Sequence, residues 1–160
     1  MAAQLSFFLE KNGYDLTVVG LPKTVDNDVF PVAQTLGAWT AAEQGSIFFE
    51  NVVNENTTSN RQLIIHEVMG RHCGWLTAQT AKDYRLKLRN KEFLPELLID
   101  KARWDIDAIY IPEEDFNFQH EVIRLRDLMD RKDSVNIFLS EGAGQDAIVR
   151  ELEEKGDVVP

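Results

Sequence analysis

Short apolar runs alternate with longer helical patterns along the chain. The first run covers 16–21, is rich in β-branched residues and stops at Pro22. Three more runs follow at 63–68, 108–111 and 135–139, each leading into a polar or glycine-containing loop and then into apolar residues at helical spacing. Strands that alternate with helices favour parallel pairing through right-handed crossovers. We therefore expect an α/β fold, a Rossmann-like parallel sheet with flanking helices.

The helical patterns define a second set of elements. The predicted helices cover 31–53, 75–88, 119–131 and 145–154, with a short helix at 94–101. Residues 2–10 also read as a helix, and Gly13 suits its C-terminal cap. Pro31 is expected in a first helical turn, because the N–H group that proline lacks has no partner there.

The predicted helix at 31–53 is apolar on two sides. One side carries Ala33, Leu36, Gly37, Ala41, Ile47, Phe48 and Val52. Trp39, Phe49 and Val53 fall on the opposite side. We interpret this second side as a contact surface for another domain or subunit, because large apolar patches on a protein surface mark interfaces.

Composition and charge narrow the class of protein. The chain has 160 residues, of which 44% are apolar, enough for one domain with a core or for two very small ones. Its net charge of −10 argues against nonspecific binding to nucleic acid, which depends on lysine and arginine. No apolar run approaches the roughly 18–20 residues of a membrane span. The single cysteine, Cys73, favours a reducing compartment, so we expect a cytoplasmic protein without nucleic-acid or membrane partners.

The loop after the first run reads Pro22-Lys23-Thr24-Val25-Asp26-Asn27-Asp28. It sets the cation of Lys23 beside the carboxylates of Asp26 and Asp28. A carboxylate can take a proton from a hydroxyl or hold Mg²⁺, and a lysine can hold a phosphate. This combination suits phosphoryl transfer, in which positioning and charge neutralisation do most of the work. The pattern is also typical of a plain Asp- and Asn-rich turn, and of the Asp-x-Asp metal loop of nucleotide-sugar transferases.

Two more loops follow predicted strands. They read Met69-Gly70-Arg71-His72-Cys73-Gly74 and Ser140-Glu141-Gly142-Ala143-Gly144. Arg71 can grip phosphate oxygens with its fork of donors, or lie in solvent on a strand-to-helix turn. Glu141 can meet a sugar hydroxyl, or favour the start of a helix. Because ligands bind beyond the carboxyl ends of parallel strands, we expect the loops to converge on one site. We interpret Glu113 and Glu114 as a solvated acidic loop.

Taken together, the three loops resemble the sugar-phosphate site of the 6-phosphofructokinases, and the resemblance runs from about residue 14 to residue 149. The motifs that carry it lie at 22–28, 67–75 and 139–142. ATP-dependent members usually have glycine where this chain has Lys23, whereas pyrophosphate-dependent members have lysine. The chain is therefore similar to the pyrophosphate-dependent branch.

This resemblance implies a fold and an activity. The fold would be the fructose 6-phosphate half of the phosphofructokinase fold. The enzyme would use Mg²⁺ and transfer a phosphoryl group reversibly from pyrophosphate to the 1-hydroxyl of fructose 6-phosphate, giving fructose 1,6-bisphosphate.

The resemblance also implies residue roles. Asp26 would be the base that takes the proton of the 1-hydroxyl, Lys23 would stabilise the transferring phosphoryl group, and Arg71 would neutralise developing charge. Asp28 would lie near Mg²⁺. The substrate-binding residues would be Thr24, Val25, Asp26, Asp28, Arg61, Met69, Gly70, Arg71 and Glu141. Arg61 would be offered to the site of a neighbouring subunit, so a homo-oligomer is implied.

The chain opens within a helical pattern and closes just after one, so we expect the central part of a longer enzyme. Residues 1–30 would be the end of the donor-binding domain with the catalytic loop, and 31–160 an incomplete fructose 6-phosphate-binding domain. We expect the isolated chain to be inactive and to self-associate through apolar surface that includes Trp39, Phe49 and Val53.

Two other functions stay open. One is a noncatalytic regulatory subunit of the same family, which the presence of Asp26 and Arg71 disfavours. The other is a metal-dependent Asp-x-Asp glycosyltransferase, which gives no reason for the loops at 69–74 and 140–144.

Overall fold

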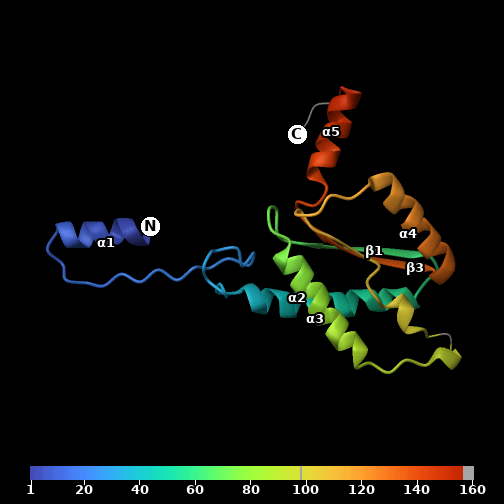
Figure 1. Cartoon of the computed structure of the whole chain (residues 1–160). Coiled ribbons are helices and arrows are strands. Elements are labelled where there is room, and N and C mark those ends of the chain that lie inside the picture. The colour runs from blue at the N-terminus through green and yellow to red at the C-terminus, as the bar shows by residue number, and fades with distance from the viewer. Residues whose placement is uncertain (98, 157–160) are drawn as a thin grey trace.

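The computed structural model describes residues 1–97 and 99–156, and Figure 1 shows the arrangement of its elements. In chain order these are α1 (Ala2–Lys11), α2 (Ala38–Val53), the 3-10 helix η1 (Asn54–Thr57), β1 (Gln62–Val68), α3 (Trp75–Arg89), the 3-10 helices η2 (Pro95–Leu97) and η3 (Lys101–Arg103), β2 (Ala108–Tyr110), α4 (Phe118–Lys132), β3 (Ser134–Ser140) and α5 (Gln145–Lys155). In the described part of the chain, none of these helices has both the length and the apolar character needed to cross a membrane.

Three parallel strands form the sheet of the described chain, in the order β1-β3-β2. The central strand β3 pairs with β1 from Ser134 to Ser140 and with β2 from Ile137 to Leu139. This parallel α/β arrangement confirms the predicted fold class. Because all three strands run the same way, the loops at 69–74, 111–117 and 141–144 leave the sheet from one edge.

The sheet is covered differently on its two faces. Side chains alternate between faces along a strand, so Phe138 of β3 points to one side and Ile137 to the other. Phe138 joins the buried cluster formed with α2 and α3, where the ring of Phe49 lies 4.5 Å from that of Phe138 and 4.7 Å from that of Tyr84. Ile137 joins a second, smaller cluster against Leu128 and its neighbours on α4.

The elements from β1 onward agree with the sequence prediction. The predicted strands at 63–68, 108–111 and 135–139 and the helices at 75–88, 119–131 and 145–154 are confirmed to within one residue at each end. The short helix predicted at 94–101 is replaced by η2 and η3, and residue 98 of that prediction lies outside the described residues.

The strand predicted at 16–21 is wrong. Residues 14–24 form neither helix nor strand, and Figure 1 shows α1 and this segment reaching away from the sheet. A strand exists through the hydrogen bonds of its backbone to a neighbouring strand, and the described residues place no strand beside this segment. Its apolar side chains at Leu16, Val19 and Leu21 are accordingly exposed.

The start of the first long helix was also predicted wrongly. The helix α2 begins at Ala38, after Gly37 in a left-handed conformation with φ of 96°, and Pro31 lies in a turn. The residues before Ala38 belong to a loop instead, because the hydroxyl of Thr35 is fully buried and donates to the backbone oxygen of Thr24 at 2.7 Å.

The two apolar sides of α2 are reversed relative to the prediction. Phe49 and Val53 are 0% exposed, whereas Phe48 is 61% exposed. Small residues explain why this side of α2 is the buried one. Phe49 and Val53 share it with Ala38, Ala42, Gly45 and Ser46. A Cβ atom at Gly45 would lie 3.0 Å from Cγ2 of Thr80, so α2 approaches α3 closely only along this stripe.

Exposed apolar surface therefore lies elsewhere than on Phe49 and Val53, although Trp39 remains partly exposed. Leu63 and Ile65 of β1 face outward and line an apolar groove of about 500 Å³ with residues of α4 such as Val122. One face of β1 is therefore open to solvent.

The reversed orientation of α2 gives a stability prediction. Replacing Phe49 with alanine removes a fully buried ring and should lower the free energy of unfolding by about 3–5 kcal/mol. Phe48→Ala is the matched control, and it should lower that free energy by about 1 kcal/mol at most because its ring is largely in water. Urea denaturation of both variants measures the difference. If Phe48→Ala lowered the free energy of unfolding more than Phe49→Ala does, the helix orientation predicted from the sequence would be the right one.

Candidate active site

Segment 22–28 forms a loop whose backbone is held by its own polar side chains. The hydroxyl oxygen of Thr24 accepts from the amide of Asp26 at 3.1 Å. Asn27 has a left-handed backbone with φ of 55°, and its Oδ1 accepts from the amide of Thr35 at 2.8 Å. The amide of Leu36 closes the loop by donating to the backbone oxygen of Pro22 at 3.0 Å.

These contacts leave the charged groups of the loop available. Within the described residues, the ammonium of Lys23 and the carboxylates of Asp26 and Asp28 make no hydrogen bond or ion pair. Asn27 provides the local bonding that is typical of a plain turn, so the two aspartates are not needed for it. The loop thus presents one cation and two carboxylates on a fixed backbone.

The glycines of the turn at 69–74 and of the neighbouring loop leave no space for a side chain. Gly70 has a φ of 132°, and a Cβ atom there would lie 2.3 Å from the backbone oxygen of Cys73. A Cβ atom at Gly142 would lie 1.7 Å from the backbone oxygen of Arg71. The hydroxyl of Ser140 donates to the backbone oxygen of Gly70 at 2.6 Å. The backbones of the 69–74 turn and the 140–144 loop therefore approach each other closely at these glycines.

The side chains of Arg71 and Glu141 form an ion pair between these two loops. The Nη2 atom of Arg71 lies 2.7 Å from Oε1 of Glu141, and its Nε lies 3.2 Å from the same oxygen. The hydrogen bond to Glu141 raises the pKa of the Arg71 guanidinium. Both side chains reach solvent, so the pair contributes little to stability and can open toward a ligand.

Cys73 joins the first two loops. Its thiol donates to the backbone oxygen of Asp26 at 3.3 Å. Burial raises the pKa of this thiol, and the nearby carboxylates of Glu113, Asp28 and Asp26 raise it further. Cys73 thus links the turn at 69–74 to the backbone of the 22–28 loop.

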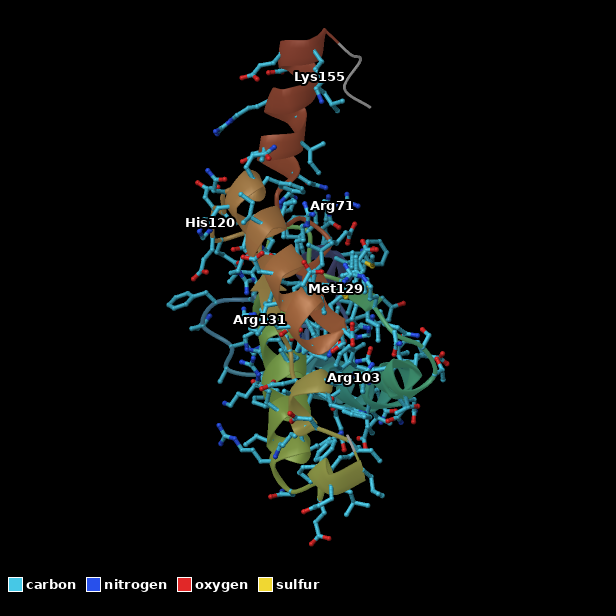
Figure 2. All side chains as sticks on the ribbon, turned by 90° about the vertical axis from the view of Figure 1, so that its right-hand side faces the viewer. Arg71, Arg103, His120, Met129, Arg131 and Lys155 are labelled. Carbon is cyan, nitrogen blue, oxygen red and sulfur yellow. The ribbon has the colours of Figure 1, made fainter. Side chains whose placement is uncertain are left out.

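A polar cavity of about 180 Å³ adjoins the Arg71 side of the cluster. Arg71, His72, Gly142, Gly144 and Asp146 contribute to its wall. In Figure 2, Arg71 lies just below the start of α5, while Arg103 and Arg131 lie toward the other end of the molecule. The three predicted loops therefore meet at the carboxyl edge of the sheet, beside space for a small ligand.

Two predicted site residues lie apart from this cluster. Arg61 precedes β1 at the opposite edge of the sheet, where its Nη1 atom lies 2.7 Å from Oδ1 of Asp130 on α4. Val25 packs against the buried cluster beneath α2 and α3. Met69, in contrast, is exposed beside Gly70 at the cluster itself.

Two residues that help to hold the loops of the site were not predicted from the sequence. Thr35 closes the 22–28 loop from eight residues away, and no local pattern marks it. Glu113 is exposed, as interpreted from the sequence, but both its oxygens also accept from the amide of Gly74, at 2.8 and 3.0 Å, and this contact was not predicted. Its position three residues after the end of β2, at the edge where the loops meet, was the available signal.

The chain belongs to the phosphofructokinase family, whose model matches residues 2–158. It is 57% identical over 159 residues to the pyrophosphate–fructose 6-phosphate 1-phosphotransferase of Methylotuvimicrobium alcaliphilum, covering 99% of this chain and 39% of that protein. The chain thus spans less than half the length of this curated relative. The ATP-dependent 6-phosphofructokinase subunit alpha of Komagataella pastoris is 33% identical over 97 residues, 58% of this chain.

The same family appears among solved structures. The crystal structure of a pyrophosphate-dependent phosphofructokinase from Marinobacter aquaeolei superposes with a TM-score of 0.61 and covers 98% of this chain and 38% of its own. At 24% identity this likeness establishes the fold, which is the phosphofructokinase fold expected from the three loops.

Proposed function

We propose that the protein containing this chain transfers a phosphoryl group from pyrophosphate to the 1-hydroxyl of fructose 6-phosphate. The observation that carries the proposal is the loop at 22–28. Its backbone is held by Thr24, Asn27 and Thr35, while its charged groups form no ion pair within the described part of the chain. The similarity to pyrophosphate-dependent relatives over 99% of the chain supports the same donor.

The chemistry assigned to these groups is an in-line displacement. Asp26 accepts the proton of the 1-hydroxyl while that oxygen bonds to the terminal phosphorus of pyrophosphate. The bond from this phosphorus to the bridging oxygen breaks, and orthophosphate leaves. Lys23 and Arg71 neutralise the charge that spreads over the phosphoryl oxygens, which is the main task in this class of reaction. The reverse reaction follows the same path.

The remaining residues bind the acceptor. Glu141 hydrogen-bonds a sugar hydroxyl, and doing so would draw it from Arg71, which is then free for phosphate oxygens. Met69 and Gly70 line the sugar pocket. Thr24 and Val25 hold the reacting groups, Thr24 by fixing the amide of Asp26 and Val25 by anchoring the loop in the core.

The residues present fit Mg²⁺ bound together with its substrate. No cluster of three or more acidic, histidine or cysteine side chains suited to a metal occurs among residues 1–97 and 99–156. Mg²⁺ commonly uses one or two carboxylates and completes its shell with phosphate oxygens and water. Asp28, exposed and unpaired beside Asp26, suits this role. The ion would supply charge neutralisation for pyrophosphate.

The wider context belongs to the same proposal. Residues 1–30 end a donor-binding domain, and 31–160 form part of the fructose 6-phosphate domain. Arg61, at the far edge of the sheet, serves a neighbouring subunit in a cytoplasmic homo-oligomer. A regulatory subunit without activity is not favoured because Asp26 and Arg71 are both in place. A glycosyltransferase is not favoured because the family and the joined loops argue for phosphoryl transfer.

Asp26 provides the first test of this function. In the whole protein, Asp26→Asn should lower kcat by roughly 10²–10⁴, the usual contribution of a positioned base, with a smaller change in the KM for fructose 6-phosphate. Asp127→Asn, an exposed aspartate of α4, is the control for loss of one charge and should leave both constants unchanged. Steady-state assays of fructose 1,6-bisphosphate formation measure the effect. A kcat of Asp26→Asn within a few-fold of the unmodified protein would remove Asp26 as the base.

Lys23 provides a test of the donor. The unmodified whole protein should use pyrophosphate and not ATP, because a compact cation suits a small and highly charged donor. Lys23→Gly should abolish most turnover with pyrophosphate without creating turnover with ATP. Lys82→Ala, which removes an exposed cation on α3, should have no effect. Efficient turnover of ATP by the unmodified protein would overturn this assignment.

A further inference from the structure

Glu113 makes a contact that the phosphoryl-transfer chemistry does not use. It lies in the loop after β2 and reaches the start of α3, where both its oxygens accept from the amide of Gly74, at 2.8 and 3.0 Å. Gly74 is the residue at the N-terminal cap of α3. A carboxylate is favourable there, because the first amides of a helix lack partners and carry partial positive charge.

The surroundings of Gly74 fix its position. Gly74 is buried, and a Cβ atom there would lie 2.4 Å from Cβ of Ile111 and 2.7 Å from Oε2 of Glu113. The end of β2 and its following loop therefore rest directly on the backbone of the 69–74 turn. Ser140 holds the beginning of the same turn through Gly70, so Glu113 is the counterpart that holds its end.

The preceding residue of the turn, Cys73, extends this contact to the 22–28 loop. The thiol of Cys73 donates to the backbone oxygen of Asp26 at 3.3 Å. A displacement of Gly74 moves Cys73, its covalent neighbour, and so moves the partner of Asp26. One connected path thus runs from Glu113 through Gly74 and Cys73 to the backbone of Asp26.

We propose that Glu113 is a positioning residue that fixes the end of the 69–74 turn and, through Cys73, the place of Asp26. The kinetic part of this inference rests on the proposed function, whereas the structural part does not. A small displacement of a catalytic group strongly lowers the rate of a reaction that depends on alignment. Since Ser140 still holds the turn without Glu113, we expect a partial loss of rate.

The single cysteine gives a readout without substrate. Thiol labelling of the 160-residue chain reports only on Cys73, and release of the turn should make this half-buried thiol more accessible. Glu113→Ala removes both the charge and the acceptor, whereas Glu113→Gln removes the charge and keeps an acceptor oxygen. Because both variants remove the same negative charge near the thiol, their comparison cancels the electrostatic effect on its reactivity.

We expect Cys73 to react at least about ten-fold faster in Glu113→Ala than in Glu113→Gln, with Glu113→Gln close to the unmodified chain. Equal rates in the two variants would overturn the proposal, because the effect of Glu113 would then be electrostatic only. Should Glu113→Ala fail to fold, Glu113→Asp replaces it, since it keeps the charge and is too short to reach Gly74. Its thiol should then react faster than that of the unmodified chain, which carries the same charge, and an equal rate would overturn the proposal.

The kinetic test uses the whole protein. Glu113→Ala should lower kcat about ten-fold with little change in the KM for fructose 6-phosphate, and Glu113→Gln should restore kcat to within about three-fold. An unchanged kcat in Glu113→Ala, or an equal loss in both variants, would contradict the positioning role. If the unmodified protein forms no fructose 1,6-bisphosphate from pyrophosphate, the proposed function fails, while the labelling result still decides whether Glu113 holds the turn.

Discussion

The site depends on the turn at 69–74, whose glycines leave no space for a side chain. It emerges from β1 and is enclosed by the ends of the other two strands, with Ser140 at its beginning and Glu113 at its end. Glycine is required where the neighbouring backbone passes, since a side chain at Gly142 would collide with the oxygen of Arg71. Because these contacts hold both ends of the turn, the groups packed against it have defined positions.

Two charged elements lean on this turn in different ways. Arg71 belongs to it and pairs with Glu141 in contact with solvent, which suits a group that changes partner when a ligand arrives. The 22–28 loop is bound to it through Cys73, and its Lys23, Asp26 and Asp28 side chains have no ion-pair partner among residues 1–97 and 99–156. A backbone held by polar neighbours and a set of free charges is a suitable arrangement for binding and transferring a phosphoryl group.

The sequence was informative where local pattern and tertiary structure agree. The three loops and their strands were predicted because glycine, charge and β-branched runs mark the carboxyl edge of a parallel sheet. The orientation of α2 was not predicted, since both its sides are apolar and only the close approach to Thr80 selects the side of small residues. Residues 16–21 have the composition of a strand, but a strand also requires a neighbour, which composition does not reveal. The contact of Glu113 with Gly74 spans 39 residues and has no local signature.

The central claim is that the 22–28 loop and the 69–74 turn form one catalytic unit. A double-mutant cycle on kcat/KM in the whole protein tests it most directly, with Asp26→Asn, Arg71→Lys and the combined variant. We predict that the loss in the combined variant is clearly smaller than the two separate losses multiplied together, because both groups act on one transition state. If the free-energy losses of the two single variants add up to that of the combined variant to within about 0.5 kcal/mol, the two groups act independently. That result would contradict the account.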